Sequence, residues 1–340
     1  MPKTFYIMDS FLLPTGYNHM FMVQKVGRGF EYHGFKTKIV NKISEIGEPG
    51  FVMICNHPVY FSLGSRHNKN GNILRVIPAL IRKADKAHLV ESTSTILRHT
   101  ALKRLAKQIK NKNVVVIAWN CQGDKKLIDE LGMRTIFTND YYNGMPLLKE
   151  HVEWYRLLKE KRNKNFMPLK FAADVNPDTI GNSCKNNKYI VSYVGDKGYM
   201  PEYRAAFVDN SRCKIVPTPP YISEDEKIDI YRNSMIVLGL SSTMNKKEKM
   251  VSERIFEALA FGCICLTDHP YAPKMTNGTA IYVKNADELK AKVDLFAKNR
   301  DTRMKQRKMG LEFTKKYGTW ASRAKDFINL ANKLYRINLK

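Results

Sequence analysis

Short apolar runs recur along the first half of the chain at intervals that suit a parallel sheet. Each run is three to five residues long, rich in Val, Ile and Phe, and bounded by polar or glycine-containing segments, which is typical of buried strands. The runs span residues 5–9, 36–40, 51–55, 114–118 and 135–137. Between the first two runs, residues 18–33 carry apolar side chains at helical spacing, and Gly34 follows as a helix stop. The pattern therefore predicts a β-loop-α-β unit, the start of a doubly wound sheet.

The same pattern resumes after a polar, turn-rich segment and predicts a second domain. In the first domain we also expect helices at residues 81–112 and 147–161 and a strand at 167–171. After the turn-rich segment we expect strands at 189–194, 235–240, 263–266 and 280–283, and helices at 224–233, from 285 onward, and at 321–335. Residues 241–249 are expected to form a polar loop. The predicted organisation is a domain at 1–172, a linker at 173–187, a second domain at 188–320 and a C-terminal helix within 321–340.

One stretch, residues 250–268, combines a helix, a tight turn and a strand. Ser252 is placed to cap the helix start with its side-chain oxygen. Glu253 and Glu257 are four residues apart and share one helix face, away from an apolar side formed by Val251, Ile255 and Leu259. Gly262 ends the helix, and a short buried strand follows.

That arrangement suits a nucleotide. A helix start offers free N–H groups and partial positive charge to a diphosphate, and a carboxylate one turn further can accept hydrogen bonds from the two hydroxyls of a ribose. The alternative interpretation is an ordinary amphipathic helix with two solvated glutamates.

The segment S-E-R-I-F-E-A-L-A-F-G-C-I-C-L-T-D, residues 252–268, resembles the nucleotide-sugar signature of GT-B glycosyltransferases. It is most similar to the spore-maturation-protein-like (CgeB-like) group, whose pattern is R-x-F-E-A-x-A-x-G. The resemblance implies an α/β fold of two Rossmann-like, doubly wound domains facing a cleft, with a C-terminal helix that crosses back to the first domain. It also implies a transferase that uses a nucleotide-diphosphate sugar, a UDP-sugar by preference, with no other cofactor and no metal.

The resemblance also assigns roles to residues. Glu257 matches the glutamate that holds the donor ribose. The residues expected at the diphosphate are Ser252, Glu253 and Arg254 at the helix start, Gly195 in the strand–glycine turn, and Lys197 or Arg204 as the basic partner. Many retaining members have a second glutamate eight residues before the first, where this chain has Lys249, so the stereochemical outcome stays open.

An inverting reaction needs a general base to deprotonate the acceptor hydroxyl. Asp9, His57 and Asp124 follow predicted strands, and ligands of parallel sheets bind beyond such strand ends. His19 lies just after the first loop. We expect the base to be among these four, with His57 favoured, although a lone histidine is more often structural.

The formal net charge of +25 in 340 residues points to a polyanionic partner, nucleic acid or an anionic membrane surface. The expected phosphate-contacting residues of the first domain are Arg98, Lys103, Arg104 and Lys107. The alternative is a composition biased toward lysine and asparagine codons, with these residues on a solvated helix face. Six scattered cysteines without a C-x-x-C pair, and no membrane-length apolar run, favour a cytoplasmic protein, in a host cytoplasm if viral, with peripheral membrane attachment left open.

The sequence is therefore compatible with three functions. The first is glycosyl transfer to a hydroxymethylated base in DNA, as in phage-type DNA modification. The second is the same chemistry on a lipid-linked or surface glycan at a membrane. The third is a non-catalytic nucleic-acid-binding protein. The sugar, the nucleotide base and the oligomeric state are left undetermined.

Overall fold

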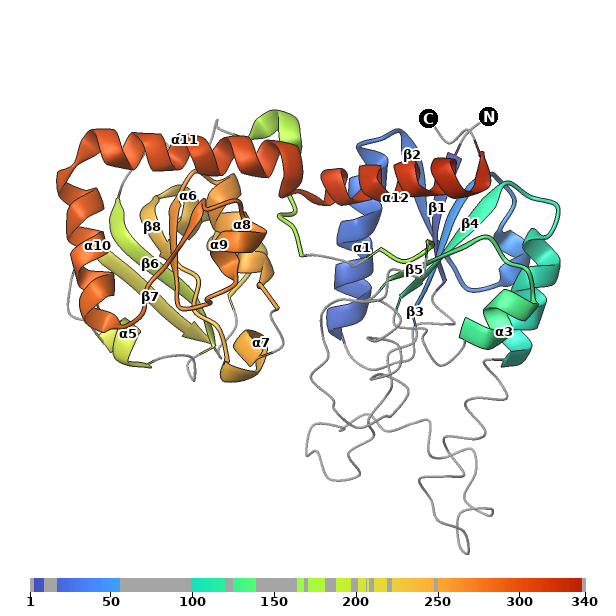
Figure 1. The fold of residues 1–340 in the computed structure, drawn as a ribbon, viewed down its shortest axis with the longest axis horizontal. Helices are drawn as coiled ribbons and strands as arrows, with labels where there is room; N and C mark the ends of the chain where they lie inside the picture. The colour runs from blue at the N-terminus through green and yellow to red at the C-terminus, as the bar shows by residue number, and fades with distance from the viewer. Residues whose placement is uncertain are drawn as a thin grey trace, which may run out of the picture.

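The chain forms two α/β domains that lie side by side in the computed structural model (Figure 1). The described residues are 3–8, 17–55, 99–119, 125–138, 164–167, 171–180, 188–196, 201–205, 207, 211–218, 222–247 and 250–337. For residues 17–22, 55, 201, 204, 244 and 247 only the backbone is described.

The first domain is built on a five-stranded sheet in the order β2-β1-β3-β4-β5, and every pairing is parallel. Its strands are β1 (Lys3–Met8), β2 (Phe35–Val40), β3 (Gly50–Cys55), β4 (Val114–Trp119) and β5 (Thr135–Thr138). The helix α1 (Tyr17–Glu31) packs on one face, and the helix over residues 99–109 packs on the other. A short helix, α3 (Lys125–Glu130), precedes β5.

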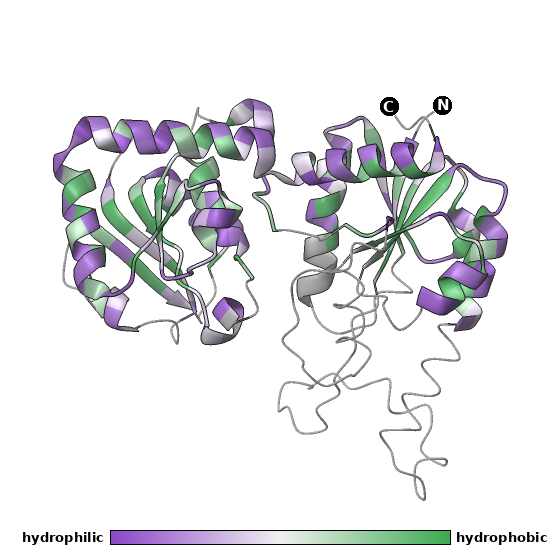
Figure 2. Ribbon diagram, viewed as in Figure 1, coloured by the Kyte–Doolittle hydropathy of each residue, from purple (hydrophilic) through white to green (hydrophobic). Residues whose placement is uncertain are grey.

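The second domain repeats the plan with a five-stranded parallel sheet in the order β10-β9-β8-β6-β7. Its strands are β6 (Tyr189–Asp196), β7 (Cys213–Thr218), β8 (Ser234–Leu238), β9 (Ile264–Thr267) and β10 (Ala280–Tyr282). Its helices are α5 (Pro201–Ala205), α6 (Glu224–Arg232), α7 (Thr243–Lys247), α8 (Glu253–Ala260), α9 (Ala272–Met275), α10 (Ala286–Lys298) and α11 (Arg300–Tyr317). In both domains the strands are hydrophobic and the helices are amphipathic, with hydrophobic and hydrophilic residues on different sides (Figure 2). The cores therefore lie between the sheets and the helices.

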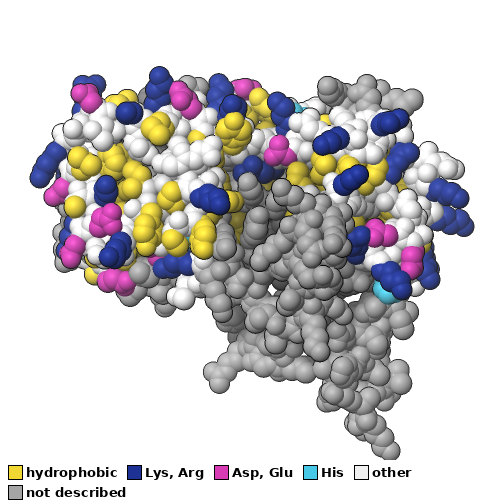
Figure 3. Space-filling model, viewed as in Figure 1, with side chains coloured by type: hydrophobic (Ala, Val, Ile, Leu, Met, Phe, Trp, Pro, Cys, Tyr) yellow, Lys and Arg dark blue, Asp and Glu magenta, His cyan; other side chains and the backbone are white. Residues whose placement is uncertain are grey.

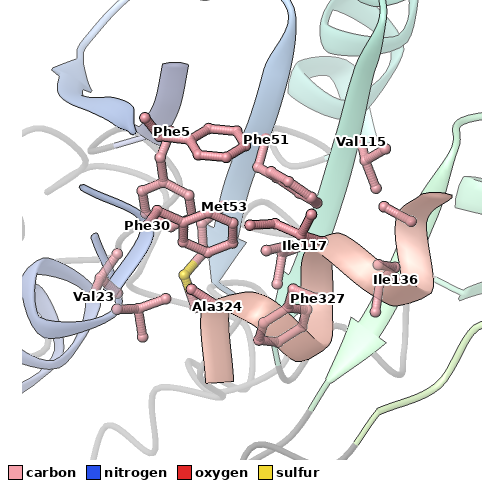
Figure 4. Packing of buried hydrophobic residues seen from close by; sticks show 14 of the residues in the cluster. Phe5, Val23, Phe30, Phe51, Met53, Val115, Ile117, Ile136, Ala324 and Phe327 are labelled. Atoms are coloured by element: carbon pink, nitrogen blue, oxygen red, sulfur yellow. The ribbon is translucent and has the colours of Figure 1, made fainter. Parts of the chain in front are cut away.

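The last helix, α12 (Trp320–Tyr335), leaves the second domain and lies across the first, beside α1 (Figure 1). Its buried residues Ala324 and Phe327 join Phe30 and Phe51 in one core cluster (Figure 4). The helices approach closely at Gly29, where a Cβ would lie 2.3 Å from the carbonyl oxygen of Trp320. The expected fold class, two doubly wound domains with a C-terminal helix that crosses back, is confirmed.

The chain thus crosses between the domains twice, and the two crossings are hydrogen-bonded to each other. Ala173 N–H donates to the Gly318 carbonyl at 2.7 Å, and Trp320 N–H donates to the Ala173 carbonyl at 3.2 Å. Nearby, Arg28 of α1 forms an ion pair with Asp174, and the Tyr32 hydroxyl donates to Asp178 at 3.1 Å. One face of α1 therefore holds the linker in place.

Parts of the structure differ from the sequence expectations. Of the strand expected at 167–171 only Met167 and Phe171 are described, and the Met167 N–H donates to the Phe137 carbonyl of β5 at 3.0 Å, next to a bridge between Phe137 and Phe166. The expected loop at 241–249 contains the helix α7. The strand β7 and the helices α3 and α11 were not predicted; β7 begins with the alternating C-K-I-V rather than a continuous apolar run, and α11 is strongly basic. The expected helix at 147–161 lies outside the described residues, as does most of the one at 81–112.

Candidate functional site

The helix α8 begins where the sequence predicts, but Ser252 does not cap it with its side chain. The backbone of Ser252 is extended, and its carbonyl accepts from the Ile255 N–H at 3.2 Å. Its hydroxyl oxygen is buried and has no hydrogen-bond partner within the described part of the chain. The predicted cap is therefore wrong, because the backbone carbonyl alone closes the first turn. A buried hydroxyl without a partner is costly unless a ligand satisfies it.

Glu253 and Glu257 share a face of α8, as predicted, and this face is turned inward. Glu257 is only 5% exposed, so the interpretation as two solvated glutamates is wrong. Its Oε1 accepts from Lys227 of α6 at 3.0 Å and lies 4.0 Å from Nζ of Lys25 on α1. Glu253 accepts from Lys25 at 2.7 Å through Oε2 and from Trp320 Nε1 at 3.2 Å through Oε1. The carboxylates of the second domain thus meet a lysine of the first.

Burial dominates the electrostatics of this pair. Burial and, after it, the charge of Glu257 raise the pKa of Glu253, Lys25 opposes both effects, and the resulting pKa is about 7. Burial lowers the pKa of Lys227, but the charges of Glu257 and Glu224 outweigh it and leave the pKa raised. Lys227 therefore stays charged beside Glu257.

The shift at Glu253 predicts a pH-dependent stability. Because the folded pKa of about 7 lies above the ordinary value of 4.5, this residue favours the fold most below about pH 4.5, and its contribution falls as the pH rises through 7. We expect the wild-type free energy of unfolding, relative to that of Glu253→Gln, to fall across this interval by up to about 1.4 kcal/mol per pH unit. Urea denaturation of both proteins at several pH values measures it; parallel pH curves would contradict the shifted pKa.

Two predicted donor residues, Gly195 and Arg254, lie against each other at the end of β6. A Cβ on Gly195 would be 2.5 Å from Nη2 of Arg254, so only glycine leaves room for the guanidinium. Arg254 donates to the Leu240 carbonyl at 3.2 Å, and its guanidinium carbon lies 5.5 Å from the ring centroid of Tyr193. A fixed cation therefore stands where β6 ends and α8 begins.

A second polar cluster, which was not predicted from the sequence, lies at the ends of β8 and β9. Asp268, 4% exposed, accepts from the Ser241 N–H at 2.9 Å and from Lys246 Nζ at 2.7 Å. Buried His269 lies 3.2 Å from the Asn245 carbonyl through Nε2, and burial lowers its pKa. These contacts anchor α7 and the segment before α8.

Five of the predicted residues, Asp9, His57, Asp124, Lys197 and Arg98, lie outside the described residues. His19 is on α1 and Arg204 on α5, but their side chains are not described. Lys103, Arg104 and Lys107 are exposed on the helix over residues 99–109, which packs on the first sheet through Leu102 and Leu105. The roles of all these residues stay predictions.

No group of three or more His, Cys, Asp or Glu side chains among the described residues is arranged to hold a metal ion. No described helix has the length and apolar character needed to span a bilayer.

Comparison with known proteins finds a family match for the second domain. Residues 194–329, less than half of the chain, match a family model described as glycosyl transferase-like. The matched segment runs from β6 into α12 and contains Gly195, Ser252, Arg254 and both inward-facing glutamates. No curated protein matches the chain in sequence.

Several solved structures resemble this chain in fold at low sequence identity. One, titled as the DNA modifying enzyme beta-glucosyltransferase, is 10% identical with a TM-score of 0.47, covering 98% of this chain and 100% of its own. An α,α-trehalose 6-phosphate synthase from Burkholderia multivorans is 9% identical with a TM-score of 0.48, covering 70% and 74%. The calicheamicin glycosyltransferase CalG4 is 12% identical with a TM-score of 0.43, covering 98% and 100%.

Proposed function

We propose that this chain, whose second domain is glycosyl transferase-like in sequence, transfers a sugar from a nucleotide-diphosphate sugar to an acceptor hydroxyl. The observation that carries the proposal is the inward-facing carboxylate of Glu257 within the matched segment. Its Oε1 is held by Lys227, while its Oε2 accepts no hydrogen bond from any described residue. A ribose hydroxyl can donate to that oxygen, and a charge-assisted bond of this kind is strong.

The diphosphate would lie at the start of α8. Arg254 supplies a fixed positive charge, Ser252 an unused hydroxyl, and the helix start its free N–H groups. Lys197 and Arg204 are proposed to add charge from the β6 side. Catalysis would then combine positioning with neutralisation of the departing diphosphate, and one of Asp9, His19, His57 and Asp124 would act as base if the reaction inverts. UDP-sugar is the favoured donor, with no metal.

The favoured acceptor is a hydroxymethylated base in DNA. The chain carries a net charge of +25, and lysine and arginine side chains are spread over the described surface of both domains (Figure 3). On the helix over residues 99–109, Lys103, Arg104 and Lys107 are exposed and form no ion pair within the described part of the chain. Unneutralised cations of this kind bind phosphates by releasing counterions.

Donor binding is tested first, by thermal shift with the diphosphates of uridine, guanosine, adenosine and cytidine and with their sugars. We expect one nucleotide series to raise the melting temperature, because a ligand that binds only the folded state stabilises it. If none does, and DNA binding persists, the chain is a non-catalytic nucleic-acid-binding protein and the proposal fails.

The acceptor is tested with the donor so identified, by sugar transfer to hydroxymethylated and unmodified duplex DNA at low salt. DNA binding is measured alongside, as the association constant for duplex DNA at several salt concentrations. We expect the Lys103→Glu/Arg104→Glu/Lys107→Glu variant to lower the slope of the logarithm of this constant against the logarithm of the salt concentration by about 2.7. The matched control reverses Lys305, Lys308 and Lys315 on α11 and leaves most of that slope in place. No transfer to DNA, together with binding to acidic vesicles, would favour a lipid-linked or surface glycan instead.

Gly195→Ala is expected to weaken donor binding about tenfold or more. The added methyl group would occupy the space of the Arg254 guanidinium, and losing one hydrogen bond to a charged group costs about 1.5–3 kcal/mol. The control is Gly47→Ala, where nothing lies within 4 Å of the new Cβ. Calorimetric titration with the stabilising nucleotide measures both variants; equal affinities would remove Arg254 from the diphosphate site.

A further inference from the structure

We infer that Lys25, on the first helix of the N-terminal domain, is a positioning residue for the donor carboxylate Glu257 of the second domain. The inference rests on the proposed function and deepens it, because it makes the first domain part of the donor site. Neither the sequence signature nor the matched segment, which begins at residue 194, includes this residue.

The burial of Lys25 is the first observation. It is 1% exposed, and lysine is almost never fully buried unless its charge is paired. Its Nζ lies 2.7 Å from Glu253 Oε2 and 4.0 Å from Glu257 Oε1, both across the domain boundary. The ammonium group of Lys25 is therefore shielded from water, and two carboxylates of the other domain lie near its charge.

The second observation is the way the four charges share their hydrogen bonds. Glu253 uses both oxygens, one for Lys25 and one for Trp320 of α12, so it holds the lysine. Glu257 offers one oxygen to Lys227 and, at longer range, to Lys25, which leaves Oε2 for a ligand. Lys227 is itself held 2.8 Å from Glu224. Cations on two sides thus fix the orientation of Glu257.

The third observation is the like charge of the two glutamates. They stand one turn apart on α8, both largely buried, and the charge of Glu257 raises the pKa of Glu253. Lys25 is the charge that lies between them. Without it the pKa of Glu253 would rise further, and Glu257 would lose the second cation that orients it. The charged and titratable groups around the pair are Lys25 and Arg28 of α1, Lys227, Glu224 and Tyr231 of α6, and Arg254 of α8.

The test compares Lys25→Met and Lys25→Arg in the full chain, with the nucleoside diphosphate that stabilises the wild type as the probe. At about pH 7 we expect Lys25→Met to raise the dissociation constant about tenfold, as one charge-assisted contact predicts. The deficit should differ between about pH 7 and pH 9, because the pKa of Glu253, about 7 in the wild type, would be raised by the loss of Lys25. Lys25→Arg should retain near wild-type affinity. With saturating donor, kcat should change little while KM rises, because the lysine does not touch the reacting atoms.

A double variant separates positioning from structural damage. Lys25→Met/Glu253→Gln leaves no unpaired charge at the boundary, and Glu257 keeps Lys227 without a like charge beside it. We expect its affinity to be independent of pH between about 7 and 9. If Lys25→Met binds like wild type, or if its deficit is equal at both pH values, the inference is wrong and the proposed function stands. If the wild type binds no nucleoside diphosphate, the proposed function and the inference both fail.

Discussion

Glu257→Gln is expected to raise the dissociation constant of the nucleotide-sugar donor by about 10- to 150-fold. This factor corresponds to the loss of one hydrogen bond to a charged group, about 1.5–3 kcal/mol. The substitution keeps the shape of the side chain and removes the charge that a ribose hydroxyl would meet. Because Lys227 keeps its contact with Glu224, the loss falls on the ligand more than on the fold. Calorimetric titration with the stabilising nucleotide, followed by KM for its sugar, measures the effect.

The control for this substitution is Glu312→Gln on α11, where the carboxylate is exposed and lies 3.9 Å from Lys308. Such surface pairs contribute little, so donor affinity should match the wild type. If Glu257→Gln binds the donor as tightly as this control, the ribose assignment is wrong and the nucleotide must be held elsewhere in the second domain.

Phe327→Ala is expected to lower the free energy of unfolding of the first domain by about 3–5 kcal/mol, the usual cost of removing a buried phenyl ring. Phe327 is completely buried, and its ring centroid lies 6.4 Å from that of Phe30. The cavity would open between α12 and the first sheet, so the C-terminal helix would lose much of its attachment. Trp119 and Trp320 belong to the same cluster, so tryptophan fluorescence in guanidinium reports the transition.

Met304→Ala on α11 is the matched control, because that side chain is 49% exposed and its loss should stay within about 0.5 kcal/mol. A Phe327→Ala transition that coincides with that of Met304→Ala would mean that α12 adds nothing to the stability of the first domain.

The sequence predicted most of the architecture because the strands of these sheets are buried on both faces. Continuous apolar runs mark β3, β4 and β9 without reference to any partner, and Gly34 and Gly262, with φ of 81° and 73°, end their helices as expected. It failed where the local pattern is weak. The strand β7 is partly exposed along most of its length and begins with alternating residues.

The candidate site was predicted in part. The sequence identified the helix α8 and the glycine turn at the end of β6, since each of them is a local pattern. It did not predict Lys25 or Trp320, because these reach Glu253 from 228 and 67 residues away and no local periodicity marks such contacts. Nor did it predict that the glutamates face inward, because charged residues on a helix are usually solvated.

The position of α12 has a consequence for the order of events during synthesis. The first domain leaves the ribosome first, and domains generally fold in that order. Here, however, one face of the first sheet is covered by α12, which follows every strand of the second domain in the sequence. Until that helix emerges, Phe30 and Phe51 lack their partner in the nascent chain. The second domain can fold before α12 has been translated. The first domain is therefore translated first but completes its core last.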